Sequence, residues 1–180
     1  MEQITKIPIA TTFGCIRPWG EQDAGSLVKF GNNPKIAKNL RDGFPSPYTL
    51  EAANRFLANV AQQNPTTFFA LEHQGEAVGA VGLSISQDVH RFSAELAYWL
   101  GEPLWGKGWM SEAVDLFCRF GFETFQLIRI FAEPYAINHA SGRVLEKAGF
   151  TLEGRLKCSV VKDGKVLDQL MYARINPDYL

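Results

Sequence analysis

The sequence has little cysteine, little histidine and almost no net charge. Its three cysteines, Cys15, Cys118 and Cys158, lie far apart, with no C-x-x-C pair and no histidine at metal-ligand spacing. We therefore expect no metal site, and a reducing compartment is the simplest setting. The formal net charge is -1 and the basic residues are scattered, so nothing marks a nucleic acid or an anionic membrane as a partner.

Long hydrophobic runs are also absent. No apolar run approaches the length of a membrane span, and the first ten residues lack the basic and apolar regions of a signal peptide. No repeat, low-complexity tract or polar linker divides the chain. Because 46% of the residues are hydrophobic and 21% are charged, the composition is that of a soluble globular protein. We expect a cytoplasmic protein with a single domain over residues 1–180.

The first third of the chain is expected to hold one strand and two helices. A strand over 11–17 precedes a modest helical pattern over 21–31, which stops at Asn32. Thr49 is a good N-cap for a second helix with an apolar stripe. Between the helices, 41–48 (RDGFPSPY) cannot be regular structure; a substrate lid and an exposed connector are equally compatible with it.

The rest of the chain is richer in strands. Four β runs predict two hairpins, 68–71 with 77–86 and 150–161 with 166–175. A short helix is expected from Asn138, with Gly149 just past its end.

A strand-helix-strand unit lies between these hairpins. A strand over 92–101 leads through a Gly-X-Gly turn into a helix of about four turns, and a further β run follows at 127–132. Such a unit closes as a right-handed crossover, which places Leu96 and Ile130 on neighbouring parallel strands. The element order predicts an α+β fold with a mixed sheet.

The turn inside this unit suggests a phosphate site. Gly106 and Gly108 lack the Cβ atoms that would hold a diphosphate away from the backbone, and the helix start adds N–H donors and a positive dipole end. Gly-X-Gly alone is a weak signal that also fits a plain tight turn, but the flanking strand and helix favour the phosphate site. Residues 101–108 (GEPLWGKG) nearly match the nucleotide-binding pattern G-x-x-x-x-G-K-S/T. Gly108 replaces the hydroxyl that holds Mg²⁺, so we reject that interpretation.

Two motifs resemble those of a known family. Residues 105–113 (WGKGWMSEA) resemble the acetyl-CoA-binding signature of the GCN5-related N-acetyltransferases, the GNAT family. Residues 138–150 (NHASGRVLEKAGF) resemble a segment of the RimJ/RimL-like branch, which acetylates the N-termini of ribosomal proteins. The resemblance covers nearly the whole chain, although Pro103 stands where the signature commonly has Gln or Arg. It implies a mostly antiparallel sheet with a central splayed parallel strand pair and flanking helices.

The resemblance also implies how the site works. Acetyl-CoA is the co-substrate, no metal is needed, and the pantetheine arm lies between the splayed strands. Glu95 takes the proton of the amine, unless it is only a polar residue on a half-exposed strand. The family's tyrosine acid falls at Leu145, so Ser141 is the candidate to protonate the thiolate, unless it is an ordinary first-turn serine. Asn138 could contact the cofactor or only cap its helix.

Backbone N–H groups near Leu96 to Trp99 are the expected oxyanion donors. The residues expected to contact the cofactor are Leu96, Tyr98, Trp99, Trp105, Gly106, Lys107, Gly108, Trp109, Met110, Ser111, Asn138 and Ser141.

The expected activity is direct acetyl transfer from acetyl-CoA to a primary amine in a ternary complex. Three alternatives stay open at this point: the α-amine of a protein N-terminus, a small-molecule amine such as a polyamine or an antibiotic, and a non-catalytic acyl-CoA-binding module. A homodimer is compatible with the sequence, which does not fix the oligomeric state.

Overall fold

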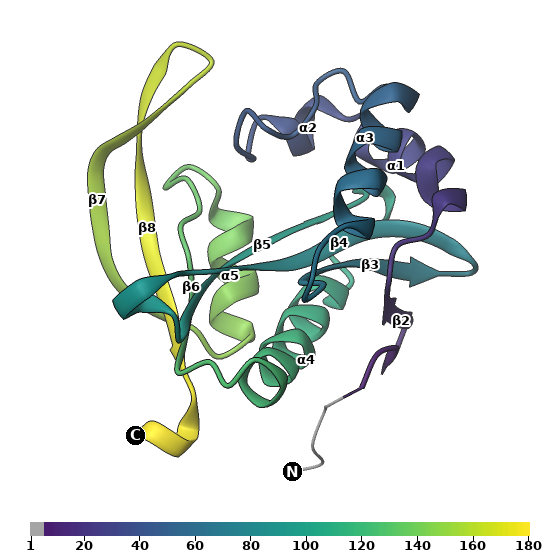
Figure 1. Ribbon diagram of the computed structural model, residues 1–180. Coiled ribbons are helices and arrows are strands. Elements are labelled where there is room, and N and C mark those ends of the chain that lie inside the picture. Colours follow the sequence, from purple (N-terminus) through teal and green to yellow (C-terminus); the bar gives the residue numbers. More distant parts are fainter. Residues whose placement is uncertain (1–5) are drawn as a thin grey trace.

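The computed structural model describes residues 6–180, so residues 1–5, part of the argument against a signal peptide, lie outside the described residues. An eight-stranded sheet runs through the fold in the order β1-β2-β3-β4-β5-β6-β8-β7 (Figure 1). The strands are β1 (Ile9–Thr11), β2 (Gly14–Arg17), β3 (Phe68–His73), β4 (Glu76–Ile85), β5 (Ser93–Leu100), β6 (Arg129–Ala132), β7 (Thr151–Lys162) and β8 (Lys165–Ile175). Only β5 and β6 pair in parallel among the described strands. The predicted α+β architecture is confirmed.

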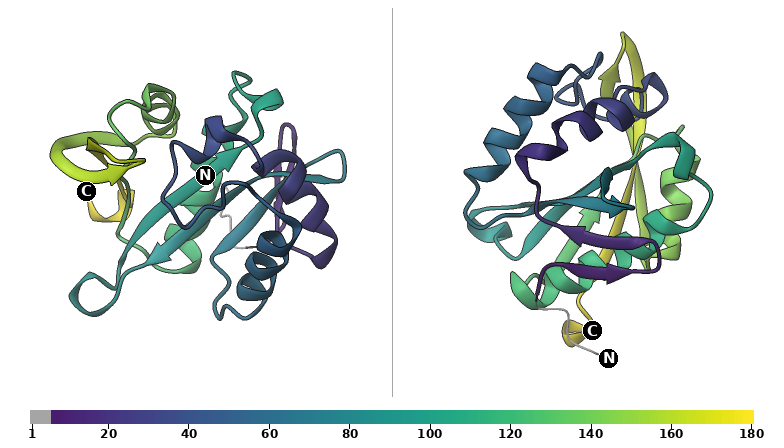
Figure 2. Two further views of the ribbon diagram at one scale, coloured as in Figure 1. Left: turned by 90° about the horizontal axis from the view of Figure 1, so that it is seen from above. Right: turned by 90° about the vertical axis from the view of Figure 1, so that its right-hand side faces the viewer.

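Helices cover both faces of this sheet, as the views in Figures 1 and 2 show. The α-helices are α1 (Ala24–Gly31), α2 (Pro34–Ala37), α3 (Leu50–Ala61), α4 (Trp109–Thr124) and α5 (His139–Lys147). Thr49 caps α3 as predicted, because its Oγ1 accepts the Ala52 N–H at 3.2 Å. None of the helices within residues 6–180 is long and apolar enough to cross a membrane.

The strand β5 separates two apolar clusters. Leu96 and Leu100 belong to the larger cluster, which includes the buried faces of α4 and α5. Trp99 instead packs against the smaller cluster that α1 and α3 form with Tyr48. Because successive side chains of a strand point to opposite faces, Glu95 shares the face of Trp99, and Tyr98 shares the face of Leu96.

Two predictions near the N-terminus need correction. The strand expected over 11–17 is a hairpin, β1 and β2, whose turn holds Thr12 and Phe13 rather than the Gly or Asn that mark such turns. The short helix α2 was not predicted. It begins at Pro34, directly after the stop at Asn32, and Asn33 caps it by accepting the Lys35 N–H at 2.8 Å.

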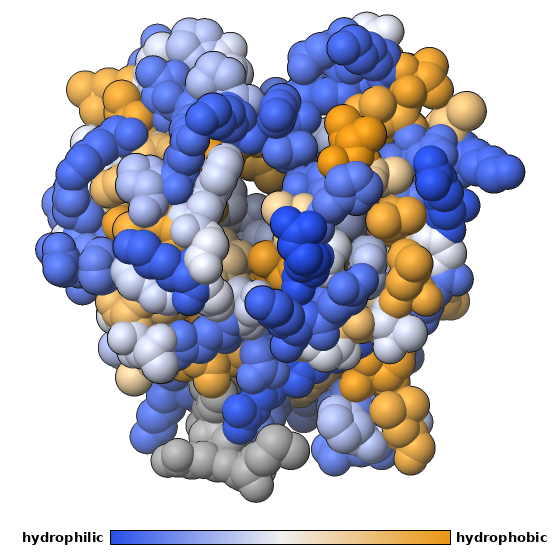
Figure 3. Space-filling view, turned by 180° about the vertical axis from the view of Figure 1, so that it is seen from behind, coloured by the Kyte–Doolittle hydropathy of each residue, from blue (hydrophilic) through white to orange (hydrophobic). Residues whose placement is uncertain are grey.

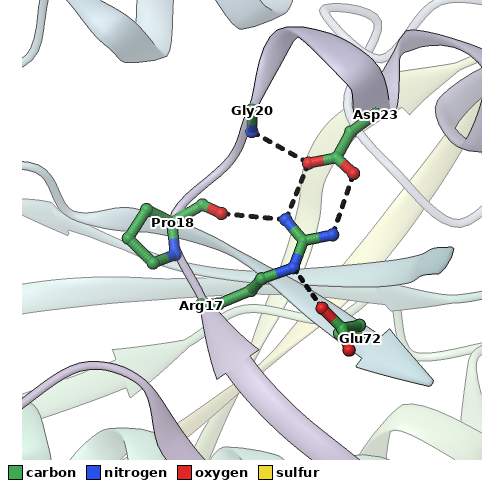
Figure 4. A network of polar contacts seen from close by, with 5 residues as sticks. All are labelled: Arg17, Pro18, Gly20, Asp23 and Glu72. Carbon is green, nitrogen blue, oxygen red and sulfur yellow. Dashed lines mark hydrogen bonds and ion pairs between the residues drawn. The ribbon is translucent and has the colours of Figure 1, made fainter. Parts of the chain in front are cut away.

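An ion-pair network joins the strands β2 and β3 to the start of α1 (Figure 4). The Arg17 guanidinium on β2 donates to both carboxylate oxygens of Asp23 at 2.8 and 2.9 Å, and its Nε donates to Glu72 at 2.5 Å. The Gly20 N–H and the Pro18 carbonyl complete the network. Asp23 is buried. Burial raises its pKa, but the hydrogen bonds from Arg17 and Gly20 outweigh this effect, so the pKa lies below its ordinary value.

Candidate active site

A cleft of about 1130 Å³ lies where β5 and β6 separate, and it opens toward the loop 41–48 and the helices α3, α4 and α5. The space-filling view from behind shows a notch between the two upper lobes of the molecule (Figure 3). The loop 41–48 has no helix or strand, as predicted, and Arg41, Phe44 and Tyr48 line the cleft. The loop is therefore a wall of the cleft and more than an exposed connector.

The parallel strand pair splays as the resemblance implied. The last register pair is Glu95 with Phe131, while β5 continues to Leu100. The Ser93 carbonyl accepts the N–H of Ser86, directly after β4, at 2.9 Å, and the Gly101 N–H donates to the Val78 carbonyl of β4 at 2.8 Å. By alternation, the N–H and C=O of Tyr98 point into the gap toward β6, whereas those of Trp99 point to β4. Among the expected donors, Leu96 and Tyr98 therefore face β6, and Tyr98 lies three residues beyond the last register pair, in the gap.

The turn before α4 leaves room for a phosphate group. Gly106 and Gly108 have φ of +78° and +80°, a conformation that favours glycine. A Cβ built on either residue meets no atom within 4 Å, so a side chain there would project into open space. The first helical turn holds one acidic residue, Glu112. Its carboxylate accepts a hydrogen bond from the Thr12 N–H at 2.6 Å and is thus paired with the N-terminal hairpin. These features fit the diphosphate of acetyl-CoA.

Lys107 and Trp109 lie beside this turn in an aromatic stack. Phe13 stacks on Trp109 with 4.8 Å between the ring centroids, and the centroid of the His73 ring lies 4.7 Å from that of Trp109. The Lys107 ammonium is 4.8 Å from the Trp109 ring centroid. This stack anchors the first turn of α4 to the N-terminal hairpin.

A charged cluster occupies the point where the strands separate. The Glu95 Oε1 lies 2.5 Å from the Arg41 guanidinium, and the Glu133 Oε2 lies 3.8 Å from the same nitrogen. Burial raises the pKa of Glu95 above its ordinary value; Arg41 opposes this shift and Glu133 adds to it. A carboxylate with a raised pKa is better matched to accept a proton from an amine.

On the other face of β5, Tyr98 meets the first turn of α5. The Tyr98 hydroxyl lies 2.7 Å from the Ser141 Oγ and 3.3 Å from the Ser141 carbonyl. Burial raises the pKa of Tyr98, so this hydroxyl stays protonated at neutral pH. The Asn138 side chain caps α5 by accepting the Ser141 N–H at 3.2 Å. Glu95 and Ser141 therefore flank the gap from opposite faces of the sheet.

The structure brings the predicted site residues together. All of them line the cleft except Lys107, which is exposed beside the turn. The Trp105 indole N–H donates to the Leu100 carbonyl at 2.7 Å and ties the turn to the end of β5. Within residues 6–180, no group of three or more His, Cys, Asp or Glu side chains is arranged to hold a metal ion.

Sequence reasoning missed two residues of the cluster, Arg41 and Glu133. The only signal for Arg41 was its place in an irregular loop, and for Glu133 its place just after a β run. Neither signal shows that the loop folds over the sheet to join them.

The comparisons with known proteins agree with this geometry. The sequence model of the acetyltransferase (GNAT) domain matches residues 15–151. An N-acetyltransferase of Bacillus licheniformis, p20, is 26% identical over 164 residues, covering 88% of this chain and 90% of that protein. The spermidine N(1)-acetyltransferase of Escherichia coli is 25% identical, covering 92% and 87%. The alanine N-acetyltransferase of ribosomal protein uS5 from Escherichia coli is 34% identical, covering 47% and 43%.

Solved structures share the fold. The ribosomal-protein-S5-alanine acetyltransferase of Vibrio fischeri superposes with a TM-score of 0.83 at 22% identity, covering 97% of this chain and 100% of that chain. RimJ of Mycobacterium smegmatis, solved with a CoA disulfide, gives a TM-score of 0.81 at 23% identity, covering 91% and 82%. The chain belongs to the acetyltransferase (GNAT) family and is an acetyl-CoA-dependent N-acetyltransferase.

Proposed function

We propose that residues 1–180 act as one acetyl-CoA-binding domain that acetylates the α-amine at the N-terminus of a protein. The transfer is direct, in a ternary complex. The observation that carries this proposal is the position of Glu95, which ends the paired part of β5 beside the gap and has a raised pKa. The relative named as the alanine N-acetyltransferase of ribosomal protein uS5 supports the choice of acceptor.

Glu95 and Ser141 divide the proton chemistry of this reaction. The amine nitrogen attacks the thioester carbon, and Glu95 takes the proton that the nitrogen loses. The Tyr98 N–H, directed into the gap, stabilises the oxyanion of the tetrahedral intermediate. When the carbon–sulfur bond breaks, Ser141 relays a proton to the thiolate and regains one from solvent in the cleft, and Glu95 releases the amine proton to solvent. The charges of the reaction then develop on opposite faces of the sheet.

The Tyr98 hydroxyl orients Ser141 for this role. At 2.7 Å from the serine oxygen, it holds the side chain in one rotamer at the wall of the cleft. Because α5 begins at His139 and its cap accepts the Ser141 N–H, the backbone of this residue is also fixed. A residue held in this way loses little entropy when it acts.

The co-substrate is held by the turn and the start of α4. Gly106 and Gly108, with Trp105, Met110 and Ser111 of the same segment, face the diphosphate. Leu96, Trp99 and Asn138 line the path of the pantetheine arm, and Lys107 and Trp109 flank the phosphate site. We propose a cytoplasmic setting, because the three cysteines are unpaired.

A small-molecule amine is the second candidate acceptor. The relative that acetylates spermidine matches 92% of this chain, about twice the share that the uS5 acetyltransferase matches. Polyamines and protein N-termini are both amines that carry a positive charge at neutral pH.

Thiol release from acetyl-CoA tests the proposal. A peptide with a free N-terminal alanine should release coenzyme A thiol, and the same peptide with a blocked N-terminus should not. Release with spermidine alone would favour the second candidate. No release with any amine, although acetyl-CoA binds, would make the chain a non-catalytic acyl-CoA-binding module.

A further inference from the structure

Two carboxylates and one guanidinium meet at the acceptor side of the cleft. The carboxylates belong to the sheet: Glu95 lies on β5 and Glu133 directly follows β6. The guanidinium of Arg41 comes from the loop 41–48, and a single nitrogen atom faces both acids, at 2.5 and 3.8 Å. The strands thus present a pocket of negative charge, and a loop supplies the cation that fills it.

The side chain of Arg41 is much more exposed to solvent than those of the two carboxylates. The side chains of Glu95 and Glu133 are 24% and 20% exposed, whereas that of Arg41 is 67% exposed. Ion pairs with an exposed partner contribute little to stability, because water and salt screen them. The guanidinium can therefore leave the two carboxylates at small cost.

Arg41 also stands between two cavities. A smaller cavity of about 290 Å³ lies between the loop and the last hairpin, and Arg41, Tyr135 and Gln169 line it as well as the main cleft. The neighbours of Arg41 in the chain make contacts in which its side chain takes no part: Asp42 pairs with Lys162 at 2.7 Å, and the Leu40 carbonyl accepts the Tyr135 hydroxyl at 3.3 Å. Rotation of the Arg41 side chain away from the carboxylates therefore breaks neither contact.

We propose that Arg41 occupies the place of the acceptor's ammonium group, and that Glu133 binds this group together with Glu95. The inference rests on the proposed function, which makes Glu95 the carboxylate on the acceptor side. The arriving ammonium ion displaces the guanidinium and opens the path between the two cavities. Glu133 is then a specificity-determining residue that selects acceptors arriving as cations. Acceptors with a carboxylate beside the amine are excluded by charge repulsion.

Three variants of the full chain separate these roles in steady-state kinetics, with spermidine and a peptide bearing a free N-terminal alanine as the probes. Arg41→Gln removes the competing cation and should lower the acceptor KM up to about fivefold, the range that exposed ion pairs span. Glu133→Gln should raise the acceptor KM about three- to tenfold with little change in kcat. Arg155→Gln is the matched control, because its side chain is 59% exposed, pairs with Asp168 at 2.6 Å and lines neither cavity. It should leave the acceptor KM unchanged.

A rise in the acceptor KM of Arg41→Gln would show that Arg41 binds the acceptor. An unchanged KM would show that Arg41 does not affect acceptor binding. Either result overturns the proposal. A fall in kcat at constant KM for Glu133→Gln overturns the role of Glu133.

A second measurement does not depend on turnover. With coenzyme A bound, the side-chain Nε–H resonance of Arg41, assigned by its loss in Arg41→Gln, should move toward that of a free arginine as spermidine is added. A resonance that stays in place under saturating spermidine contradicts the displacement. Failure of every amine to release thiol, with the resonance still moving, contradicts the proposed catalysis and leaves the displacement supported.

Discussion

At the scale of single residues, the candidate chemistry depends on two side chains in contrasting surroundings. Glu95 lies on a half-buried strand beside a second carboxylate, and its pKa is raised. Ser141 lies in the first turn of α5, where a protonated tyrosine holds its hydroxyl. One environment favours the uptake of a proton, and the other orients a hydroxyl donor.

Replacing Glu95 by Gln should lower kcat/KM on the order of 10²-fold at neutral pH. The loss should shrink at high pH, where the amine is already neutral. Because the pKa of Glu95 is raised, activity of the unaltered chain should fall as the pH drops through that raised pKa and the carboxylate becomes protonated. The profile of kcat/KM against pH measures this. A Glu95→Gln profile parallel to that of the unaltered chain would make Glu95 a structural residue.

Replacing Ser141 by Ala should reduce kcat and kcat/KM together, because the hydroxyl acts mainly in the transition state. The loss should be modest, since a coenzyme thiolate is a fair leaving group and water can partly replace the hydroxyl. Tyr98→Phe should give a smaller loss in kcat, since it frees the Ser141 side chain without removing it. Acetyl-CoA affinity, measured by calorimetry, should stay nearly constant in both. Weaker acetyl-CoA binding with unchanged turnover at saturation would show that Ser141 is a ground-state contact.

At the scale of elements, the turn before α4 and the end of the β5–β6 pairing form the cofactor site. The strand-turn-helix pattern predicted this turn because two glycines and an amphipathic helix are local signals. The splay was implied by the family resemblance, and the register confirms it. The charged cluster could not be predicted, because Arg41 meets Glu95 only through the path of an irregular loop that carries no periodic signal.

Gly108→Asp should remove acetyl-CoA binding, because a carboxylate would project into the open space where the diphosphate lies. Gly75→Asp is the matched control, since Gly75 has a similar φ of +83° and equally open surroundings in the β3–β4 turn. Both variants carry the same backbone strain, so the thermal midpoint without ligand should fall by similar amounts. Only Gly75→Asp should still respond to acetyl-CoA. An equal response in both variants would show that the phosphate site lies elsewhere.

Asp23→Asn should destabilise the fold by about 3 kcal/mol, because it removes one partner of a largely buried ion pair. Glu76→Gln is the comparison, since it breaks an exposed pair with Lys29 and should cost less than about 1 kcal/mol. Urea unfolding measures both.

The acid dependence of the Asp23 network has a definite sign. The pKa of Asp23 is below its ordinary value of 3.8, so its contribution is fully present above that pH and is lost as the pH falls through the lower folded-state value. The stability difference between the unaltered chain and Asp23→Asn should therefore shrink below about pH 3.8. A difference that stays constant through this range would show that Asp23 does not titrate with a lowered pKa.

At the scale of the whole molecule, one sheet carries two chemically distinct faces that meet at a single gap. The face under α4 and α5 supplies the cofactor turn and Ser141, and the face under α1 and α3 supplies Glu95 and the loop 41–48. A ligand that binds only the folded protein stabilises it by mass action. Acetyl-CoA at 100 times its dissociation constant should thus add about 2.7 kcal/mol of stability. ATP with Mg²⁺ should add none.

The most direct test of the account combines thiol release with mass spectrometry of the acceptor. The purified chain, acetyl-CoA and a peptide with a free N-terminal alanine should yield equal amounts of coenzyme A thiol and of peptide carrying one acetyl group on its α-amine. Glu95→Gln should form both products more slowly in the same ratio. Thiol release without acetylated peptide, or acetylation at a lysine side chain in place of the α-amine, would contradict the account.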